Sequence, residues 1–353
     1  MGKNKRQIIQ ILKNSLDFNK LNKIKNSIKE LKKDLDNSDW RLSEPKQIQQ
    51  NEIVLKKEYL KKELEQIIET KTIERTKYYI NRLIKGITEI RTGKINDINL
   101  NRWKEYDDII TDSLWVLNKR DNSGAHSAGY WGNFIPQIPN QFLRRFTKKD
   151  EWVLDTFLGS GTTLIECKRL GRNGIGIELQ KNVVNLAKEN VNEEKNNFDS
   201  DIRIINADST ELDYKKELKK IGIDSVQFLI MHPPYWDIIK FSEDKKDLSN
   251  ASSVNEFLSL FGKIIDKTIP ILDKGRFLAV VIGDKYVKGE WIPLGFYTMQ
   301  EVLKRNYKLK STIVKNFEDT TAKRNQKSLW KYRALVGGFY IFKHEYIFLF
   351  QKR

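Results

Sequence analysis

Residues 152–178 read WVLDTFLGSGTTLIECKRLGRNGIGIE and decide the fold expected for this chain. An apolar run ends in Asp155 and leads into the turn Gly159-Ser160-Gly161, after which Thr162 opens a helical pattern. A second apolar run ends in Glu178. This order of strand, glycine turn, helix and strand with an acidic end is typical of a nucleotide-binding βαβ unit. The glycines leave room for a ligand against the backbone, because they carry no Cβ.

The spacing of the glycines narrows the class of ligand. No third glycine follows Gly159 and Gly161 at the position that a dinucleotide fingerprint requires. A mononucleoside therefore fits this turn better than a ligand with a pyrophosphate. Glu178 stands where an acid can accept hydrogen bonds from ribose hydroxyls.

Charge and cysteine content limit the classes of function. The 353 residues have a formal net charge of +17, so we expect attraction to a polyanion, nucleic acid before membrane. A proteome biased towards Lys, Asn and Ile would raise the charge without such a partner. The single cysteine, Cys167, excludes a disulfide framework, and the three histidines lack metal-ligand spacing. We find no signal peptide or long apolar segment and expect a soluble, cytoplasmic protein.

Residues 1–100 differ from the rest and are expected to form a helical, coiled-coil-like arm. The 3-4 spacing of an a/d seam is met by Leu21, Ile24, Ile28, Leu31 and Leu35. Ser43 to Pro45 indicates the start of a second helix. We predict two long helices in an antiparallel hairpin, or a longer coiled coil. Three uses stay open: a partner arm (for a homodimer or a specificity or restriction subunit), a DNA-gripping arm, or a helical pair that packs on the core.

Strands and helices alternate in residues 101–353, which we expect to form one domain. Besides the two opening runs, strands are predicted at 202–205, 225–231, 277–282, 310–314 and 346–350. Helices are predicted at 181–192, 209–221, 254–272 and 299–306. The pattern predicts an α/β fold with a mostly parallel, seven-stranded sheet. The carboxyl ends of strands, where such sheets bind ligands, carry Asp155, Glu178, Asp208, His232 and Asp284.

The second informative stretch is His232-Pro233-Pro234-Tyr235, directly after a predicted strand. Two prolines make a rigid, extended turn without N–H donors, so its backbone offers carbonyl acceptors only. A tyrosine held by this turn can stack on a planar ring, and Trp236 is a second candidate. An acceptor at position 232 beside an aromatic face is what the exocyclic amino group of a base requires.

Together these stretches resemble the S-adenosylmethionine-dependent DNA amino-methyltransferases, which methylate adenine N6 or cytosine N4. The family's first motif resembles Asp155 to Thr163. Its catalytic motif, an Asp, Asn or Ser followed by Pro-Pro-Tyr or Pro-Pro-Phe, resembles His232 to Tyr235. Residues 134–139, FIPQIP, resemble the segment that covers the methionine moiety. The resemblance spans residues 124–350 and implies a Rossmann-like class I methyltransferase fold, S-adenosyl-L-methionine as cofactor and double-stranded DNA as partner.

The resemblance also implies roles by position. Glu178 takes the ribose hydroxyls, and Asp208 with Ser209 meets the adenine of the cofactor. The remaining cofactor-binding positions are Pro136, Asp155, Phe157, Gly159, Ser160, Gly161 and Thr162. The catalytic positions are His232, Pro233, Pro234 and Tyr235.

His232 departs from the family pattern. A neutral histidine can accept the hydrogen bond of an amino group and a protonated one cannot, so we predict activity that falls as pH drops through about 6.5. The alternative is a degenerate, inactive site. Adenine N6 is preferred as the target, because a serine at this position would have indicated cytosine N4.

A base inside a duplex must be flipped out before it reaches such a pocket, and phosphate contacts must offset the cost. The basic, aromatic stretch 304–333 is the expected source, within a DNA-contacting segment at 314–345; a solvated hairpin is the alternative. The candidate DNA contacts are Trp236, Lys323, Arg324, Asn325 and Arg333. About 70 residues separate the two motifs, too few for a recognition domain. Sequence readout then comes from the N-terminal helices, the 236–253 loop, the 315–340 segment or a separate subunit.

The leading prediction is a site-specific DNA methyltransferase of a restriction-modification system, or an orphan enzyme. A second reading is an RNA or protein-glutamine amino-methyltransferase, because Pro-Pro-Tyr motifs also serve those substrates. A third is a non-catalytic DNA-binding or assembly protein that retains the fold.

Overall fold

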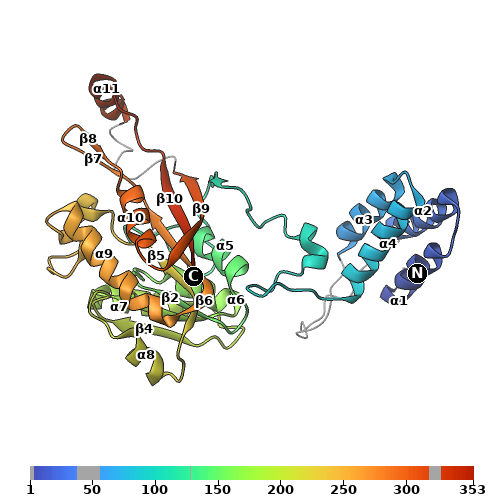
Figure 1. The fold of residues 1–353 in the computed structure, drawn as a ribbon, viewed down its shortest axis with the longest axis horizontal. Helices are drawn as coiled ribbons and strands as arrows, with labels where there is room; N and C mark the ends of the chain where they lie inside the picture. The colour runs from blue at the N-terminus through green and yellow to red at the C-terminus, as the bar shows by residue number, and fades with distance from the viewer. Residues whose placement is uncertain (1–3, 38–55, 128, 318–326) are drawn as a thin grey trace. The chain divides into compact units, whose positions relative to one another are not determined.

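The structure, a computed structural model, describes residues 4–37, 56–127, 129–317 and 327–353. Two compact units are present, and Figure 1 draws both. The helical unit contains the described residues up to Lys94 together with Ile98–Asp108. The sheet unit contains Ile95–Asp97 and the described part of Ile109–Arg353. Among the helices of these described ranges, none has both the length and the apolarity to cross a membrane.

The described part of the helical unit has four helices and one 3-10 turn. They are α1 (Lys5–Leu16), α2 (Leu21–Asn37), α3 (Lys57–Glu69), α4 (Ile73–Thr88) and η1 (Leu100–Glu105). The prediction of two long helices is therefore wrong. Local capping separates α3 from α4, because the Thr72 side chain accepts the Arg75 amide at 3.2 Å and begins α4. Asn4 and Gln7 form a capping box at the start of α1. The predicted helix start at 43–45 lies outside the described residues.

The predicted a/d seam on α2 is buried within this unit. Ile24, Ile28, Leu31 and Leu35 are at most 1% exposed. They share one core with apolar residues of α1, α3 and α4. The chain's own helices therefore occupy the seam, so a second chain cannot pair through it as in a coiled coil.

The sheet unit is built on eight strands in the order β1-β9-β10-β6-β5-β2-β3-β4. Their bounds are β1 (Leu114–Trp115), β2 (Trp152–Asp155), β3 (Asn173–Glu178), β4 (Ile202–Asn206), β5 (Val226–Met231), β6 (Leu272–Ile282), β9 (Tyr307–Asn316) and β10 (His344–Lys352). Only β10 runs antiparallel to its neighbours in this described sheet. The predicted Rossmann-like α/β fold is confirmed, with one strand more than the seven expected, because two-residue β1 joins the edge beside β9.

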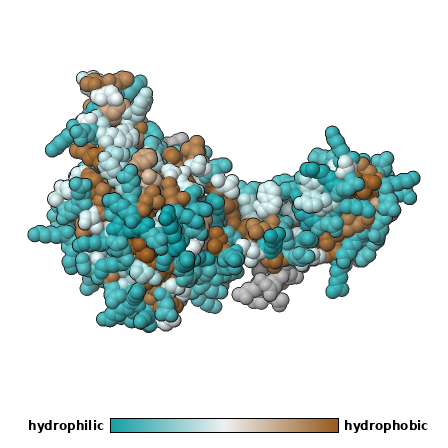
Figure 2. All heavy atoms as spheres, viewed as in Figure 1, coloured by the Kyte–Doolittle hydropathy of each residue, from teal (hydrophilic) through white to brown (hydrophobic). Residues whose placement is uncertain are grey.

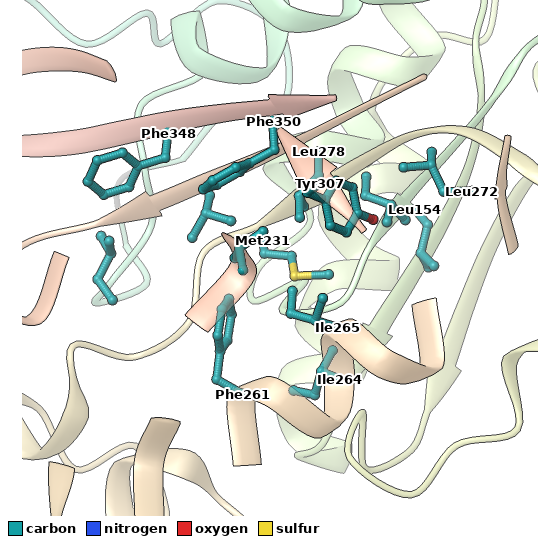
Figure 3. Packing of buried hydrophobic residues seen from close by; sticks show 14 of the residues in the cluster. Leu154, Met231, Phe261, Ile264, Ile265, Leu272, Leu278, Tyr307, Phe348 and Phe350 are labelled. Atoms are coloured by element: carbon teal, nitrogen blue, oxygen red, sulfur yellow. The ribbon is translucent and has the colours of Figure 1, made fainter. Parts of the chain in front are cut away.

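Helices cover both faces of the sheet (Figure 1). One face packs on α8 (Tyr214–Lys220), α9 (Val254–Thr268) and α10 (Leu294–Leu303), the other on α5 (Gln137–Phe146), α6 (Thr162–Leu170) and α7 (Lys181–Glu193). Alternate residues of a strand point to opposite faces, so Leu229 and Met231 join the first core, and Phe228 and Ile230 join the second. Figure 3 shows Met231 among the α9 side chains of the first core.

Several predicted boundaries are wrong. Helix α8 begins at Tyr214 rather than at residue 209, because the Asp213 side chain caps it by accepting the Lys216 amide at 3.1 Å. Helix α9 ends at Thr268, and the Pro270-containing turn η4 (Ile269–Ile271) leads into a β6 longer than predicted. Helix α10 begins at Leu294, five residues before the predicted start.

Three elements near the end of β6 and before β10 were not predicted. A two-stranded hairpin is formed by β7 (Lys285–Val287) and β8 (Glu290–Ile292), and α11 (Lys327–Gly337) follows β9. Short apolar runs flanked by charge carry too little periodicity to separate such elements from loops.

Candidate active site

A cavity of about 590 Å³ lies at the carboxyl ends of the central parallel strands. The two sequence motifs meet there. Nine of the predicted functional residues line it: Phe157, Gly159, Thr162, Glu178, Asp208, His232, Pro233, Pro234 and Tyr235. Six others do not: Pro136, Asp155, Ser160, Gly161, Trp236 and Arg333. The predicted DNA contacts Lys323, Arg324 and Asn325 lie outside the described residues.

The turn after β2 brings backbone rather than side chains to the cavity. Gly159 and Gly161 have φ values of +54° and +96°, a region that favours glycine. A Cβ at Gly161 would lie 2.9 Å from Cγ2 of Val191, so the position is closed sterically as well. Ser160 supports the turn from behind, donating its hydroxyl to Oδ1 of Asn133 at 2.8 Å.

Asp155 lies beneath the turn and stabilises it. Its Oδ1 accepts the Phe157 amide at 2.9 Å, and its Oδ2 accepts the Thr163 hydroxyl at 2.6 Å. Burial raises the pKa of Asp155 to about 6, against these two hydrogen bonds. Both oxygens are engaged within the protein, so the side chain shapes the cradle from outside the cavity wall.

Glu178 reaches the cavity from the end of β3. Its Oε2 accepts the Gly159 amide at 3.1 Å, and its Oε1 accepts the Gln180 amide at 2.9 Å. Burial raises the pKa of Glu178, although both amides lower it. The carboxylate thus links the glycine turn to the second strand and still presents acceptor oxygens to a ligand.

Asp208 and Ser209 have different hydrogen-bond partners. Asp208 lines the cavity, and its Oδ1 accepts the amide and hydroxyl of Thr210 at 2.8 and 2.7 Å. The Ser209 hydroxyl instead donates to the Thr156 carbonyl at 2.7 Å. Ser209 therefore ties the β4 end to the β2 end.

Aromatic residues from the segment before α5 wall the cavity. The ring of Tyr130 stacks on Phe241 with centroids 6.4 Å apart, and Phe134 meets His232 edge-on at 5.0 Å. The segment is tied down by His126, whose Nε2 lies 2.6 Å from Oε1 of Glu166 on α6. Pro136 is the N-cap residue of α5 and only follows this wall.

His232 and Tyr235 belong to a chain of polar contacts that the sequence analysis missed. Nε2 of His232 lies 3.2 Å from the Tyr235 hydroxyl, which donates to Oε2 of Glu345 at 2.7 Å. Oε1 of Glu345 accepts from Nζ of Lys315 at 2.8 Å. A signal was available: Glu345 is an acid at the start of an otherwise apolar strand, HEYIFLF.

Burial changes the expected titration of His232. It lowers the pKa of His232 to about 4, with Lys315 lowering it further and Glu345 opposing. The acid limit predicted from the ordinary pKa of about 6.5 is therefore too high. His232 is neutral, and so a competent acceptor, throughout the physiological range.

Trp236 does not line the cavity and instead contacts other residues of the protein. Its φ of +50° is unusual for a bulky residue and turns the chain sharply after the prolines. The indole N–H donates to the Ala251 carbonyl at 2.8 Å, and Nζ of Lys285 lies 4.0 Å from the ring centroid. Asp284 does line the cavity, and its side chain also accepts the Gly295 amide and the Trp291 indole N–H.

Helix α11 presents an exposed surface that is both apolar and basic. Its exposed fractions reach 65% for Tyr332, 75% for Leu335 and 70% for Val336, and Arg333 is also exposed. Hydrophobic residues gather over this helix at the top of Figure 2. Phe339 stacks on Tyr286 of β7 with centroids 4.0 Å apart, which fixes the end of the helix to the hairpin.

The family follows from a comparison of the whole chain with known proteins. A family model described as DNA methylase matches residues 2–189 and 226–353, well over half of the chain. This chain belongs to the DNA methylase family.

Curated relatives of this chain are named Type II methyltransferases. M2.LlaDCHI of Lactococcus lactis subsp. cremoris is 36% identical over 96 residues, 26% of this chain and 32% of that protein. M.HindIII of Haemophilus influenzae is 31% identical over 117 residues, 33% of this chain and 37% of that protein. The chain thus spans well under half the length of each. Among solved structures, TrmN from Thermus thermophilus is 16% identical, with a TM-score of 0.40, covering 62% of this chain and 49% of that one.

The cofactor of this chain is S-adenosyl-L-methionine, as its family implies, and the cavity fits it. The glycine turn offers backbone without a Cβ, and Glu178 presents carboxylate oxygens that could accept hydrogen bonds from the hydroxyls of a ligand. Tyr130, Phe134 and Phe157 supply apolar walls for the rest of a nucleoside.

Proposed function

We propose that this protein is a site-specific DNA methyltransferase of a restriction-modification system. It transfers a methyl group to an exocyclic amino group of a flipped-out base, with adenine N6 preferred over cytosine N4. One observation carries the proposal: the glycine turn with Glu178 and the stretch His232 to Tyr235 line the same cavity. This juxtaposition supports a site in which a nucleoside lies beside a hydrogen-bond acceptor and an aromatic face.

Residues on one side of the cavity bind the cofactor, and residues on the other side contact the target base. Gly159, Thr162, Glu178 and Asp208 hold the cofactor, which when bound supplies an electrophilic methyl group. On the other side, neutral His232 accepts a hydrogen bond from the target amino group. This contact draws the nitrogen towards a pyramidal geometry and makes its lone pair available for attack.

Tyr235 provides the stacking surface for the base. Its ring packs against Gly283, where a Cβ would lie 2.8 Å from Cε2 of the tyrosine, and its hydroxyl is held by Glu345. A ring fixed at both ends loses little freedom when a base stacks on it. Pro233 and Pro234 keep the turn extended and leave it without N–H donors.

The DNA contact that we propose is α11 with the residues after it. Its exposed Tyr332, Leu335 and Val336 combine with Arg333 and Lys331, a mixture suited to phosphate binding beside unstacked bases. Phe342 and His344, which follow the helix, line the cavity. The proposed DNA surface is therefore continuous with the proposed catalytic site.

The helical unit is our candidate for a protein partner or an additional DNA contact. Because its seam is buried within the unit, a homodimer or a specificity or restriction subunit would bind its outer, charged faces. Activity on cellular DNA places the protein in the cytoplasm.

The experiment is a transfer assay with labelled S-adenosyl-L-methionine and duplex DNA, followed by nucleoside analysis. We expect label in DNA as N6-methyladenine, and no transfer by His232→Ala. N4-methylcytosine would reverse the preference for the base. Label in RNA or in a glutamine side chain would support the second reading, and cofactor binding without transfer to any polymer would support the non-catalytic one. The exposed substitution Glu189→Gln on α7 is the control.

A further inference from the structure

Four side chains form a continuous polar chain that ends at the cavity. Lys315 on β9 and Glu345 on β10 are directly paired across the two strands and are 5% and 8% exposed. Glu345 then contacts the Tyr235 hydroxyl, and Tyr235 contacts Nε2 of His232. The cross-strand pair thus reaches the catalytic stretch through one phenol.

The position of each proton in this series of hydrogen bonds can be assigned in turn, starting from Lys315. The Lys315 ammonium has donors only. Burial alone would raise the pKa of Glu345, but Lys315, His232 and the hydrogen bonds from Lys315 and Tyr235 together bring this pKa below its ordinary value. Glu345 is therefore a carboxylate, which only accepts, so the single phenolic proton of Tyr235 points to Glu345.

The imidazole must then donate to the phenol. The Tyr235 oxygen donates its proton to Glu345 and can therefore only accept a hydrogen bond from His232. Nε2 of His232, which lies 3.2 Å from that oxygen, must then carry the ring proton. A neutral imidazole with a protonated Nε2 has Nδ1 as its acceptor. The edge contact with Phe134 at 5.0 Å also restrains the ring.

We propose that Glu345 and Lys315, acting through Tyr235, are positioning residues that hold His232 in its Nε2–H tautomer and leave Nδ1 to accept from the substrate amino group. The tautomer rests on these contacts and on the ionised carboxylate of Glu345 beside Lys315, whereas the role of Nδ1 rests on the proposed function. A carboxylate that sets a catalytic histidine through a fixed hydrogen bond is a known device in other enzymes, here extended by one tyrosine.

The tautomer is measured directly on the full chain by NMR with 15N-labelled histidine. The chain has three histidines, and His126→Gln and His344→Gln assign the other two. We expect His232 in the Nε2–H form alone. Tyr235→Phe keeps the ring and removes the phenol, and should give a mixture of both neutral forms. A wild-type His232 protonated on Nδ1, or a Tyr235→Phe spectrum unchanged from wild type, overturns the inference.

Glu345→Gln tests the role of the carboxylate. The glutamine amide can donate a hydrogen bond to the Tyr235 oxygen, and the phenolic proton is then free to point towards His232. We expect an increased Nδ1–H population and a transfer rate lower by roughly 100-fold, with cofactor affinity unchanged. Lys315→Met should act in the same direction, and Lys310→Met, exposed on the same strand, is the control. A shifted tautomer with an unchanged rate overturns the role of Nδ1, and an unshifted tautomer overturns the positioning role of Glu345. If none of the variants nor the wild type transfers methyl groups, the proposed function fails while the spectra still decide the tautomer.

Discussion

Nε2 of His232 lies 3.2 Å from the hydroxyl oxygen of Tyr235, so two side chains of the proposed catalytic stretch contact each other. The prolines between them set this geometry, because they restrict the backbone to an extended turn. The first nitrogen of the imidazole is thereby engaged within the protein, and only the second remains for a substrate.

The pH dependence of methyl transfer should follow the half-buried His232. Since burial lowers the pKa of His232 to about 4, the neutral acceptor form persists on acidification until that range. We expect the single-turnover rate to stay level from neutral pH down to about 5 and to fall below it. Asparagine accepts a hydrogen bond but does not titrate, so His232→Asn should lose the fall in rate at acid pH that protonation of His232 causes. A wild-type rate that halves near the ordinary value of about 6.5 would contradict the burial effect.

Cofactor affinity should depend on Glu178. Glu178→Ala removes the carboxylate that holds the Gly159 amide and faces the cavity. Hydrogen bonds to charged groups contribute about 1.5–3 kcal/mol, so Kd should rise by roughly ten- to hundredfold. Calorimetric titration with S-adenosyl-L-methionine measures this, with Glu189→Gln as the exposed control. An unchanged Kd for Glu178→Ala would remove this residue from the cofactor site.

Gly161→Ala should destabilise the sheet unit more than a matched glycine substitution. Gly161 and Gly222 both have positive φ, but a Cβ at Gly161 would meet Val191 at 2.9 Å, whereas nothing lies within 4 Å of one at Gly222. Overpacking adds about 1–3 kcal/mol to the backbone strain common to both. Urea denaturation gives the two free energies of unfolding. Equal losses of unfolding free energy in the two variants would mean that Val191 and its helix move aside without an energetic penalty.

Gly283→Ala should reduce methyl transfer without affecting cofactor binding. The added methyl would lie 2.8 Å from Cε2 of Tyr235 and 3.1 Å from Cδ2, so the ring must move. A shift of that size at a catalytic position can lower the rate by roughly 100-fold. Rate and Kd measured on the same preparation separate the two effects. Unaltered turnover would argue against a role for the Tyr235 ring position.

DNA affinity should fall when the charges of α11 are removed. Lys331→Gln with Arg333→Gln deletes two exposed cations, so the slope of log affinity against log salt should decrease by about 2. Lys215→Gln with Lys216→Gln on α8, at the far end of the sheet unit (Figure 1), is a charge-matched control. Fluorescence anisotropy with duplex DNA at several salt concentrations gives both slopes. Equal effects of the two pairs would indicate general electrostatic attraction without a defined DNA surface.

Sequence patterns predicted the strands of the central sheet because their apolar runs are continuous and bounded by turns. The same patterns failed where structure depends on distant partners. Helices of the N-terminal unit have the predicted a/d spacing, yet periodicity alone does not state which surface covers the seam. The described part of the chain covers it with its own α1, α3 and α4.

The sequence by itself determined the two motifs, their order and the strand ends that carry them, since these depend on neighbours along the chain. Only the tertiary structure decided what surrounds them. Tyr235 and Glu345 are 110 residues apart and meet because β10 returns antiparallel beside β6 and β9. Burial, which depends on all these elements at once, then lowers the pKa of His232 to about 4. A residue type and its spacing specify the acceptor, whereas its protonation is set by packing from the rest of the fold.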